Sequence, residues 1–246
     1  SRRIILNRLN MQVEILKNFF LGREMGLAFP LVILAFGASL ADTNYTQLRP
    51  KPDRATINKG LTSPKADFMI YKLGIPGSLT LNCDGKDLGL TNARLKELMV
   101  KQDFGPFRAT GLKPATEAIM RVLSKVKTEK PDLYKQLGTD GMLCVRKRRG
   151  GTVFTNHSWG TAIDIKINGK ADAFGDDQTM LGLSELYPYF AAEKFYWGAA
   201  FGKGKEDSMH FEASKELIEE WAADGKLEST SGAVSPMIRL LRRMSE

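Results

Sequence analysis

The sequence is poor in the residues that usually bind metals and carry redox chemistry. It contains two histidines and two cysteines among 246 residues, and it has no Cys-x-x-Cys pair of the kind found in zinc ribbons. It also has no phosphate-binding loop, no dinucleotide-binding glycine fingerprint and no internal repeat. These absences argue against nucleotide-binding enzymes and against a zinc held by cysteines.

A long hydrophobic run is missing as well. A helix needs about 20 apolar residues to cross a bilayer, whereas the uncharged stretch at residues 26–41 is shorter and includes Pro30. Basic residues precede it, and Ser39 and Ala41 are small, as before a signal-peptidase site. We expect residues 1–41 to be a signal-like segment cleaved after Ala41, and the protein to be periplasmic or extracellular. The alternative is an uncleaved apolar arm that anchors the protein to a membrane or an assembly.

The charge balance is moderately positive. Lysine and arginine outnumber aspartate and glutamate by 36 to 28, which gives a formal net charge of +8. Such a surplus suits an anionic partner such as a cell wall, and it also suits nucleic acid. The four adjacent cations at residues 146–149 are typical of a solvated turn. Interleaved aromatic residues and a nucleic-acid reader motif are absent, so we expect no nucleic-acid partner.

The two cysteines, Cys83 and Cys144, leave two possibilities open. They can form one disulfide if the protein is exported, or they can be two small buried thiols. Mass spectrometry of the unreduced protein separates these possibilities.

Apolar periodicity predicts a mixture of helices and short strands. Helices are expected at residues 91–100, from Pro114 onward, at 181–192 and from a cap at Ser214. The helix that begins at Pro114 has a predicted core stripe. This stripe consists of Ala118, Ile119, Val122, Leu123 and Val126. Strands are expected at residues 79–83, 142–145 and 162–167.

Composition divides the rest of the chain. Residues 42–65 are polar and rich in proline, which predicts an irregular linker. Residues 66–225 contain the predicted helices and strands and form the expected domain. Residues 226–246 form a basic C-terminal tail, with a short amphipathic segment from Met237 to Met244.

The chemically active residue types gather around the two histidines. His157 precedes a run in which the isoleucines of residues 163–167 alternate with other residues, so Asp164 faces the opposite side of the strand. His210 comes much later in the chain. Two imidazoles and one carboxylate can supply three protein ligands to zinc and leave a fourth position for water. We therefore expect His157, Asp164 and His210 to bind one metal ion.

Two further carboxylates lie close to His210 in sequence. Asp207 precedes it by three residues and is the candidate general base for a metal-bound water. A turn between the two residues is required, because they would not share one face of a flat strand. Glu212 alternates with His210 and is expected to orient its imidazole.

These motifs resemble the zinc D-alanyl-D-alanine carboxypeptidases of the VanY type. That family has the pattern Ser-x-His-x-x-Gly-x-Ala-x-Asp, followed downstream by Glu/Asp-x-x-His. The corresponding residues here are Thr155, His157, Gly160, Ala162 and Asp164, then Asp207 and His210. Thr155 replaces the usual serine but keeps a hydroxyl, and Asp207 stands where glutamate is common.

The resemblance implies a Zn²⁺ ion on the three predicted ligands, with Asp207 as a catalytic residue. It also implies an arginine that contacts a substrate carboxylate or carbonyl oxygen. Arg146 is the candidate for this role, and Arg148 is the competing choice. The implied fold is α+β, with an antiparallel sheet backed by helices, as in the Hedgehog signalling domain.

The implied substrates are peptidoglycan stem peptides. D-Ala-D-Ala carboxypeptidase activity is the first expectation, and endopeptidase activity of the endolysin kind is the alternative. A zinc-bearing binding module without catalysis is a further alternative, for which Asp207 would not be required. Contact with a membrane is expected only through an uncleaved N-terminal segment.

Overall fold

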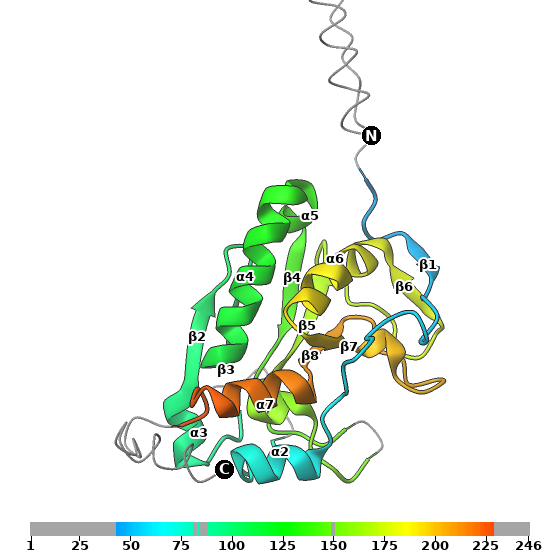
Figure 1. Cartoon of the computed structure of the whole chain (residues 1–246). Helices are drawn as coiled ribbons and strands as arrows, with labels where there is room; N and C mark the ends of the chain where they lie inside the picture. The colour runs from blue at the N-terminus through cyan, green and yellow to red at the C-terminus, as the bar shows by residue number, and fades with distance from the viewer. Residues whose placement is uncertain (1–42, 81–82, 84–87, 149–150, 229–246) are drawn as a thin grey trace, which may run out of the picture. The chain divides into compact units, whose positions relative to one another are not determined.

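The computed structural model describes residues 43–80, 83, 88–148 and 151–228, which are coloured in Figure 1. This part of the chain is a mixture of helices and antiparallel sheets, which confirms the predicted α+β class. Among the described residues, no helix is both long enough and apolar enough to cross a membrane. The predictions for residues 1–41 and for Met237 to Met244 lie outside the described residues.

The largest sheet has four antiparallel strands in the order β4-β5-β8-β7. The strands are β4 (Leu137–Gly141), β5 (Ala162–Ile167), β8 (His210–Ala213) and β7 (Phe195–Trp197). In β5 the three isoleucines are fully buried and Asp164 lies on the opposite face, as the alternation predicts. Register pairs Asp164 with His210 on β8. Two predicted ligands are therefore brought together by strand pairing.

Helix α6 (Leu181–Ala192) covers the isoleucine face of this sheet. The ring of Phe190 stacks on that of Phe211 in β8, with ring centroids 4.1 Å apart. Gly182 lies against Ile167, so that an added Cβ atom would come within 3.1 Å of its side chain. Figure 1 shows α6 beside β5. Helix α6 thus covers the apolar face of the sheet, and Asp164 lies on the opposite face.

Helix α4 (Lys113–Glu129) carries Pro114 in its first turn and buries the whole predicted stripe. It is followed by the short helix α5 (Pro131–Lys135). Helix α3 (Ala93–Leu98) is shorter than predicted, because Met99 and Val100 begin a strand instead. That strand, β2 (Met99–Asp103), forms a hairpin with β3 (Arg108–Leu112).

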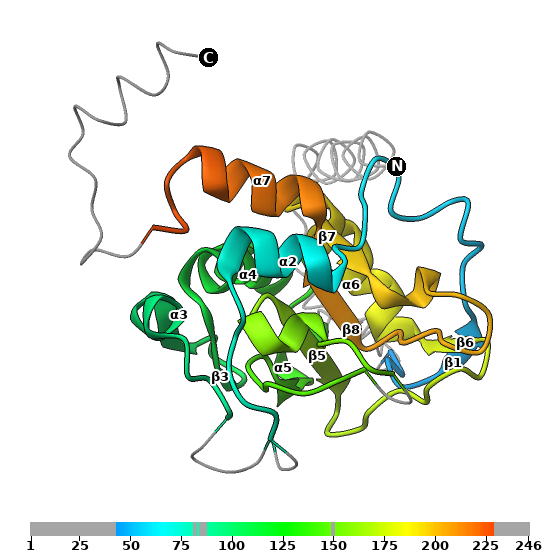
Figure 2. The same ribbon diagram turned by 90° about the horizontal axis from the view of Figure 1, so that it is seen from below.

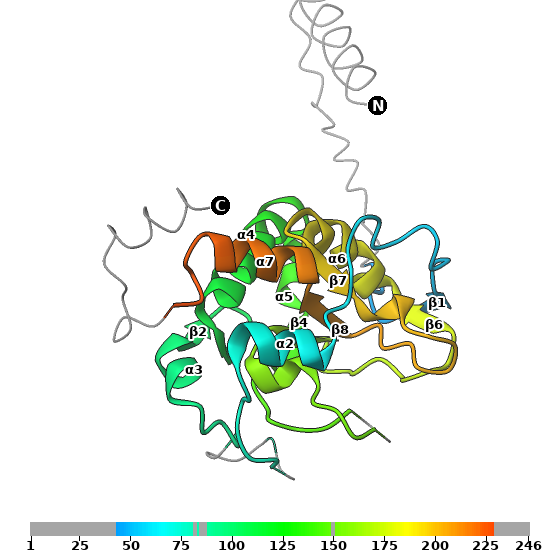
Figure 3. The same cartoon turned by 60° about the horizontal axis from the view of Figure 1, so that its bottom comes forward.

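Helices α2 (Ala66–Leu73) and α7 (Lys215–Ala223) lie next to each other in Figures 2 and 3. The Nζ atom of Lys215 lies 5.6 Å from the ring centroid of Phe68, which joins the two helices. Ser214 caps α7, as predicted, by accepting a hydrogen bond from the Leu217 amide at 3.2 Å.

The segment at residues 43–65, for which the sequence predicts an irregular linker, packs against the four-stranded sheet. Its strand β1 (Leu48–Pro50) pairs with β6 (Gln178–Met180), and Tyr45 and Ile57 are buried. The Asn58 side chain exchanges two hydrogen bonds of 2.9 Å with the backbone of Trp197. A side-chain amide here takes the place of a neighbouring strand on β7, which protects the edge of the sheet.

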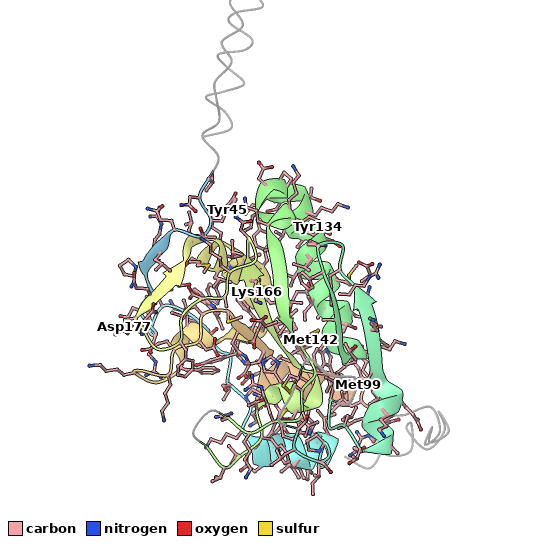
Figure 4. The ribbon with its side chains drawn as sticks, turned by 180° about the vertical axis from the view of Figure 1, so that it is seen from behind. Tyr45, Met99, Tyr134, Met142, Lys166 and Asp177 are labelled. Atoms are coloured by element: carbon pink, nitrogen blue, oxygen red, sulfur yellow. A yellow bond between two sulfur atoms is a disulfide. The ribbon has the colours of Figure 1, made fainter. Side chains whose placement is uncertain are left out.

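The predicted strand at residues 142–145 is wrong. Strand β4 ends at Gly141, and the four residues after it pair with several elements rather than with one strand. Leu143 donates to Thr110 of β3, Cys144 to the His157 carbonyl, and Val145 to the Leu88 carbonyl. Met142 follows β4 directly, beside the lower end of that strand in Figure 4. Of the strand predicted at residues 79–83, residues 79 and 80 are not in a strand and residues 81–82 lie outside the described part.

Candidate metal centre

His157 is placed by a short 3₁₀ helix, η1 (Asn156–Trp159), which immediately precedes β5. Gly160 ends this helix with a positive φ of 63°. An added Cβ atom there would lie 2.9 Å from the backbone nitrogen of Leu112. Only glycine suits this combination of conformation and close approach, and it turns the chain directly from His157 into the strand that carries Asp164.

His210 is the first residue of β8, and the turn expected between it and Asp207 is present. Residues 208 and 209 form the turn, and the His210 amide donates to the Asp207 carbonyl at 3.2 Å. Gly198 lies beneath the turn, and an added Cβ atom there would come 2.4 Å from the Asp207 carbonyl oxygen. The turn therefore depends on a close backbone contact with Gly198.

Three side-chain atoms converge on one point. His157 Nε2 lies 3.2 Å from both Asp164 Oδ1 and His210 Nδ1, and the last two atoms are 3.0 Å apart. Among the described residues, this is the one group of three or more such side chains that could hold a metal ion. The structure thus brings together the three residues that the sequence predicts as ligands.

The other ring nitrogen of each histidine already has an acceptor. His157 Nδ1 lies 2.8 Å from the Met142 carbonyl oxygen, and His210 Nε2 lies 2.8 Å from Glu212 Oε2. A carbonyl and a carboxylate can only accept, so each of these nitrogens carries the proton. In the neutral imidazoles, Nε2 of His157 and Nδ1 of His210 then present lone pairs toward Asp164. Three lone pairs facing one point repel one another unless a cation lies between them, so the residues fit a metal ion.

The electrostatics of the site agree with this reasoning. Burial disfavours a charged His210, but hydrogen bonds to Asp164 and Glu212 raise the pKa of its imidazole to about 10. Burial likewise acts to raise the pKa of Asp164, yet the two histidines hold that pKa well below its usual range. The surroundings of the two imidazoles therefore favour a positive charge, which a bound cation would supply.

Glu212 orients His210, as predicted, and is itself held by two residues that the motifs do not include. Its Oε1 accepts a hydrogen bond of 2.5 Å from Ser63, and its Oε2 accepts one of 2.7 Å from Asn156. Burial would raise the pKa of this carboxyl, whereas His210, Ser63 and Asn156 together lower it. Asn156 could have been suspected as the neighbour of His157. Nothing in the sequence signals Ser63, which lies 149 residues from Glu212.

Asp207 lies near the metal ligands but is not one of them. Burial is the main cause that raises the pKa of its carboxyl, and Asp164 raises it further, while His210, His157 and Arg146 lower it. No hydrogen bond to its carboxylate is found among the described residues. This carboxylate is thus half-buried beside the centre and remains available for a ligand.

Of the two candidate arginines, Arg146 is the one that lies close to the metal ligands. Its Nη2 atom lies 4.0 Å from Asp164 Oδ2, whereas Arg148 is exposed. The backbone of Arg146 is held by Ser158, whose hydroxyl accepts from its amide at 3.2 Å and donates to its carbonyl at 3.0 Å. The Arg146 side chain remains 38% exposed, so the guanidinium lies at the rim of the site.

Comparisons with known proteins point to the same region. Residues 148–213 match the family described as D-alanyl-D-alanine carboxypeptidase. The match includes the three candidate ligands and Asp207, and it begins after Arg146. Comparisons with curated proteins and with solved structures gave no match. The match to residues 148–213 confirms the resemblance expected from the two motifs.

Proposed function

We propose that this protein is a zinc-dependent D-Ala-D-Ala carboxypeptidase that acts on peptidoglycan stem peptides. One observation carries the proposal: His157, Asp164 and His210 converge on one point inside the matched family domain, with Asp207 beside them. A site built only to hold a structural metal would not need an additional half-buried carboxylate next to the ligands.

The donor set suits zinc. Two imidazole nitrogens and one carboxylate oxygen are common zinc ligands, and three protein ligands leave a position for water. When bound, zinc would lower the pKa of that water to about 7 and polarise the scissile carbonyl. Met142 and Glu212 would keep the two imidazoles in the orientation that this binding needs.

Asp207 would act as the general base and then as the general acid. It would take a proton from the attacking water and pass it to the leaving amine. A carboxyl with a raised pKa is a better proton carrier at neutral pH than an exposed aspartate. Gly198 would hold the turn that positions this carboxylate, because it allows the backbone of Asp207 to come close.

Arg146 would bind an oxygen of the substrate. Its guanidinium lies at the rim of the site, close to Asp164 and partly exposed. Charge-assisted hydrogen bonds from arginine are suited to a carboxylate, or to a carbonyl oxygen that gains negative charge during attack. The terminal D-alanine of a stem peptide offers the carboxylate, and the D-alanine before it offers the scissile carbonyl oxygen.

An exported location is part of the proposal. Cys83 and Cys144 form a disulfide, with their Cα atoms 5.5 Å apart, and disulfides persist in oxidising compartments. The positive charge surplus suits an anionic cell wall. These two features support a periplasmic or extracellular protein.

Mass spectrometry of muropeptides digested with zinc-loaded protein tests the proposal. We expect loss of one terminal alanine from pentapeptide stems. Products cut within the stem or the cross-link would instead assign endopeptidase activity. Intact muropeptides in the presence of protein with one bound zinc would leave a zinc-bearing module without catalysis, and would contradict the proposal.

A further inference from the structure

The segment at residues 142–148 connects two parts of the site. At one end the Met142 carbonyl accepts the hydrogen bond from His157, and at the other end Arg146 approaches Asp164. The segment belongs to no strand of the main sheet, so its position depends on bonds to neighbouring elements. On one side these neighbours are β3 and η1, through Leu143 and Cys144.

On the other side the segment is held by described residues of the preceding chain, within residues 77–80, 83 and 88–90. Gly77 and Leu90 form an isolated bridge there. The Thr80 amide donates to the Val145 carbonyl, and the Val145 amide donates to the Leu88 carbonyl, both at 2.9 Å. The Cys83–Cys144 disulfide adds a covalent link at the same place. Val145 and Cys144 directly precede Arg146, so this contact supports the backbone from which the arginine extends.

We propose that the Cys83–Cys144 disulfide is a positioning device for Arg146, an inference that rests on the peptidase activity proposed above. The three metal ligands lie on η1, β5 and β8. Among the described residues, they are bonded to a cross-linked cysteine through the hydrogen bond of 3.1 Å from the Cys144 amide to the His157 carbonyl. The His157 side chain is held by the Met142 carbonyl instead, which does not involve the cysteines. Arg146 differs from the metal ligands, because its long side chain is partly exposed and depends on its backbone for its position. Loss of the cross-link should therefore impair the use of substrate while leaving the metal in place.

This arrangement also couples activity to the compartment. The cross-link forms when the two thiols reduce an external disulfide to two thiols, so it requires oxidising surroundings. Both cysteines lie outside the matched family domain. The disulfide therefore lies in the part of the chain that precedes the matched residues.

A double-mutant cycle tests the proposal. The four zinc-loaded proteins are the wild type, C83S/C144S, R146A and the triple variant, each assayed for kcat and KM on the same muropeptide. We expect removal of the cysteines to lower kcat/KM about ten-fold in the wild type and less than about two-fold in the R146A background. Zinc content should remain one per chain in all four proteins. An equal loss in both backgrounds, an unchanged kcat/KM, or loss of zinc from C83S/C144S would overturn the proposal.

Loss of stability alone must be separated from positioning. L133A removes a fully buried side chain of α5 that lies beside Gly182 of α6. It serves as the control that lowers stability at another place in the fold. We expect it to keep kcat/KM within about two-fold of the wild type. If C83S/C144S does not fold, the folded wild type is assayed after reduction with a water-soluble phosphine. That reagent gives two thiols and a phosphine oxide, whose oxygen comes from water.

Amide hydrogen exchange provides a measurement that needs no substrate. We expect the amides of Val145 and Arg146 to exchange at least ten-fold faster in C83S/C144S than in the wild type, and the amide of Ile165 in β5 to be unchanged. If no protein of the set cleaves muropeptides, the proposed function fails. Exchange at Val145 and Arg146 still decides whether the cross-link positions this segment, and unchanged exchange would refute it.

Discussion

The candidate site is built from two regions that contribute in different ways. Residues 148–213 match the family and supply all three candidate metal ligands together with Asp207. Residues 43–147 lie before the match, and they supply supports: Ser63 for Glu212, the Met142 carbonyl for His157, and Arg146 at the rim. We infer that the first region determines whether the reaction occurs. The second region determines how well the metal ligands and the substrate-binding arginine are placed.

The largest effect is expected for a ligand in the first region. H210A removes one of three donors and should leave a protein that retains no zinc after dialysis and has no detectable hydrolysis. Metal analysis and the muropeptide assay measure the two effects together. Treating the wild type with a chelator should abolish hydrolysis in the same way, and adding zinc should restore it to the wild type but not to the variant. A variant that kept stoichiometric zinc would remove His210 from the ligand set.

Asp207 should separate catalysis from metal binding within the first region. D207A should keep one zinc per chain and lower kcat by about 10²–10⁴-fold, since general acid–base catalysis contributes that much. D132N is the matched control, because Asp132 is an exposed aspartate on α5 that pairs with Lys135. Undiminished hydrolysis by zinc-loaded D207A would show that Asp207 is not the proton carrier.

A support in the second region should have a smaller effect. S63A removes the hydroxyl that donates to Glu212 and should weaken zinc affinity or kcat/KM by about ten-fold, at the lower end of the effects seen for partners of metal ligands. S124A, which removes an exposed hydroxyl from α4, should change neither quantity. A loss from S63A as large as that from H210A would erase the distinction between the two regions.

The smallest effect on the site is expected for a carboxylate of the first region that the mechanism does not use, whose substitution should change stability instead. Burial raises the pKa of Asp172 to about 6, so the folded state binds more protons than the unfolded state between about pH 4 and 6. Stability from this group is then lost as the pH rises through that window. D172N should raise the free energy of unfolding at pH 8 by about 1–3 kcal/mol and change it little at pH 4. Denaturant unfolding at the two pH values checks this, and an equal change at both would contradict it.

The two regions also differ in how far the sequence predicts them. In the first region and in the helices, patterns of neighbouring residues were sufficient to predict the local structure. The alternation of isoleucines predicts the face of β5 on which Asp164 lies, and Ser214 predicts the cap of α7. The spacing of Asp207 and His210 predicts the turn that lies between them. Each of these signals depends on residues within a few positions of one another.

The second region depends on contacts between distant residues. Ser63 reaches Glu212, and Asn58 occupies the edge of β7, although both lie in a segment with a linker-like composition. Residues 142–145 have the apolar character of a strand, but tertiary partners on several sides take their backbone hydrogen bonds. Local propensity carries no information about such partners, so the contacts of Ser63, Asn58 and residues 142–145 could be found only from the structure.

The convergence of three side chains on one zinc ion can be tested most directly by crystallography with anomalous scattering at the zinc absorption edge. We expect one peak per chain, with His157 Nε2, Asp164 Oδ1 and His210 Nδ1 each about 2.0–2.2 Å from it. No peak between these atoms in crystals grown with zinc, or a peak that either histidine does not reach, would contradict the account.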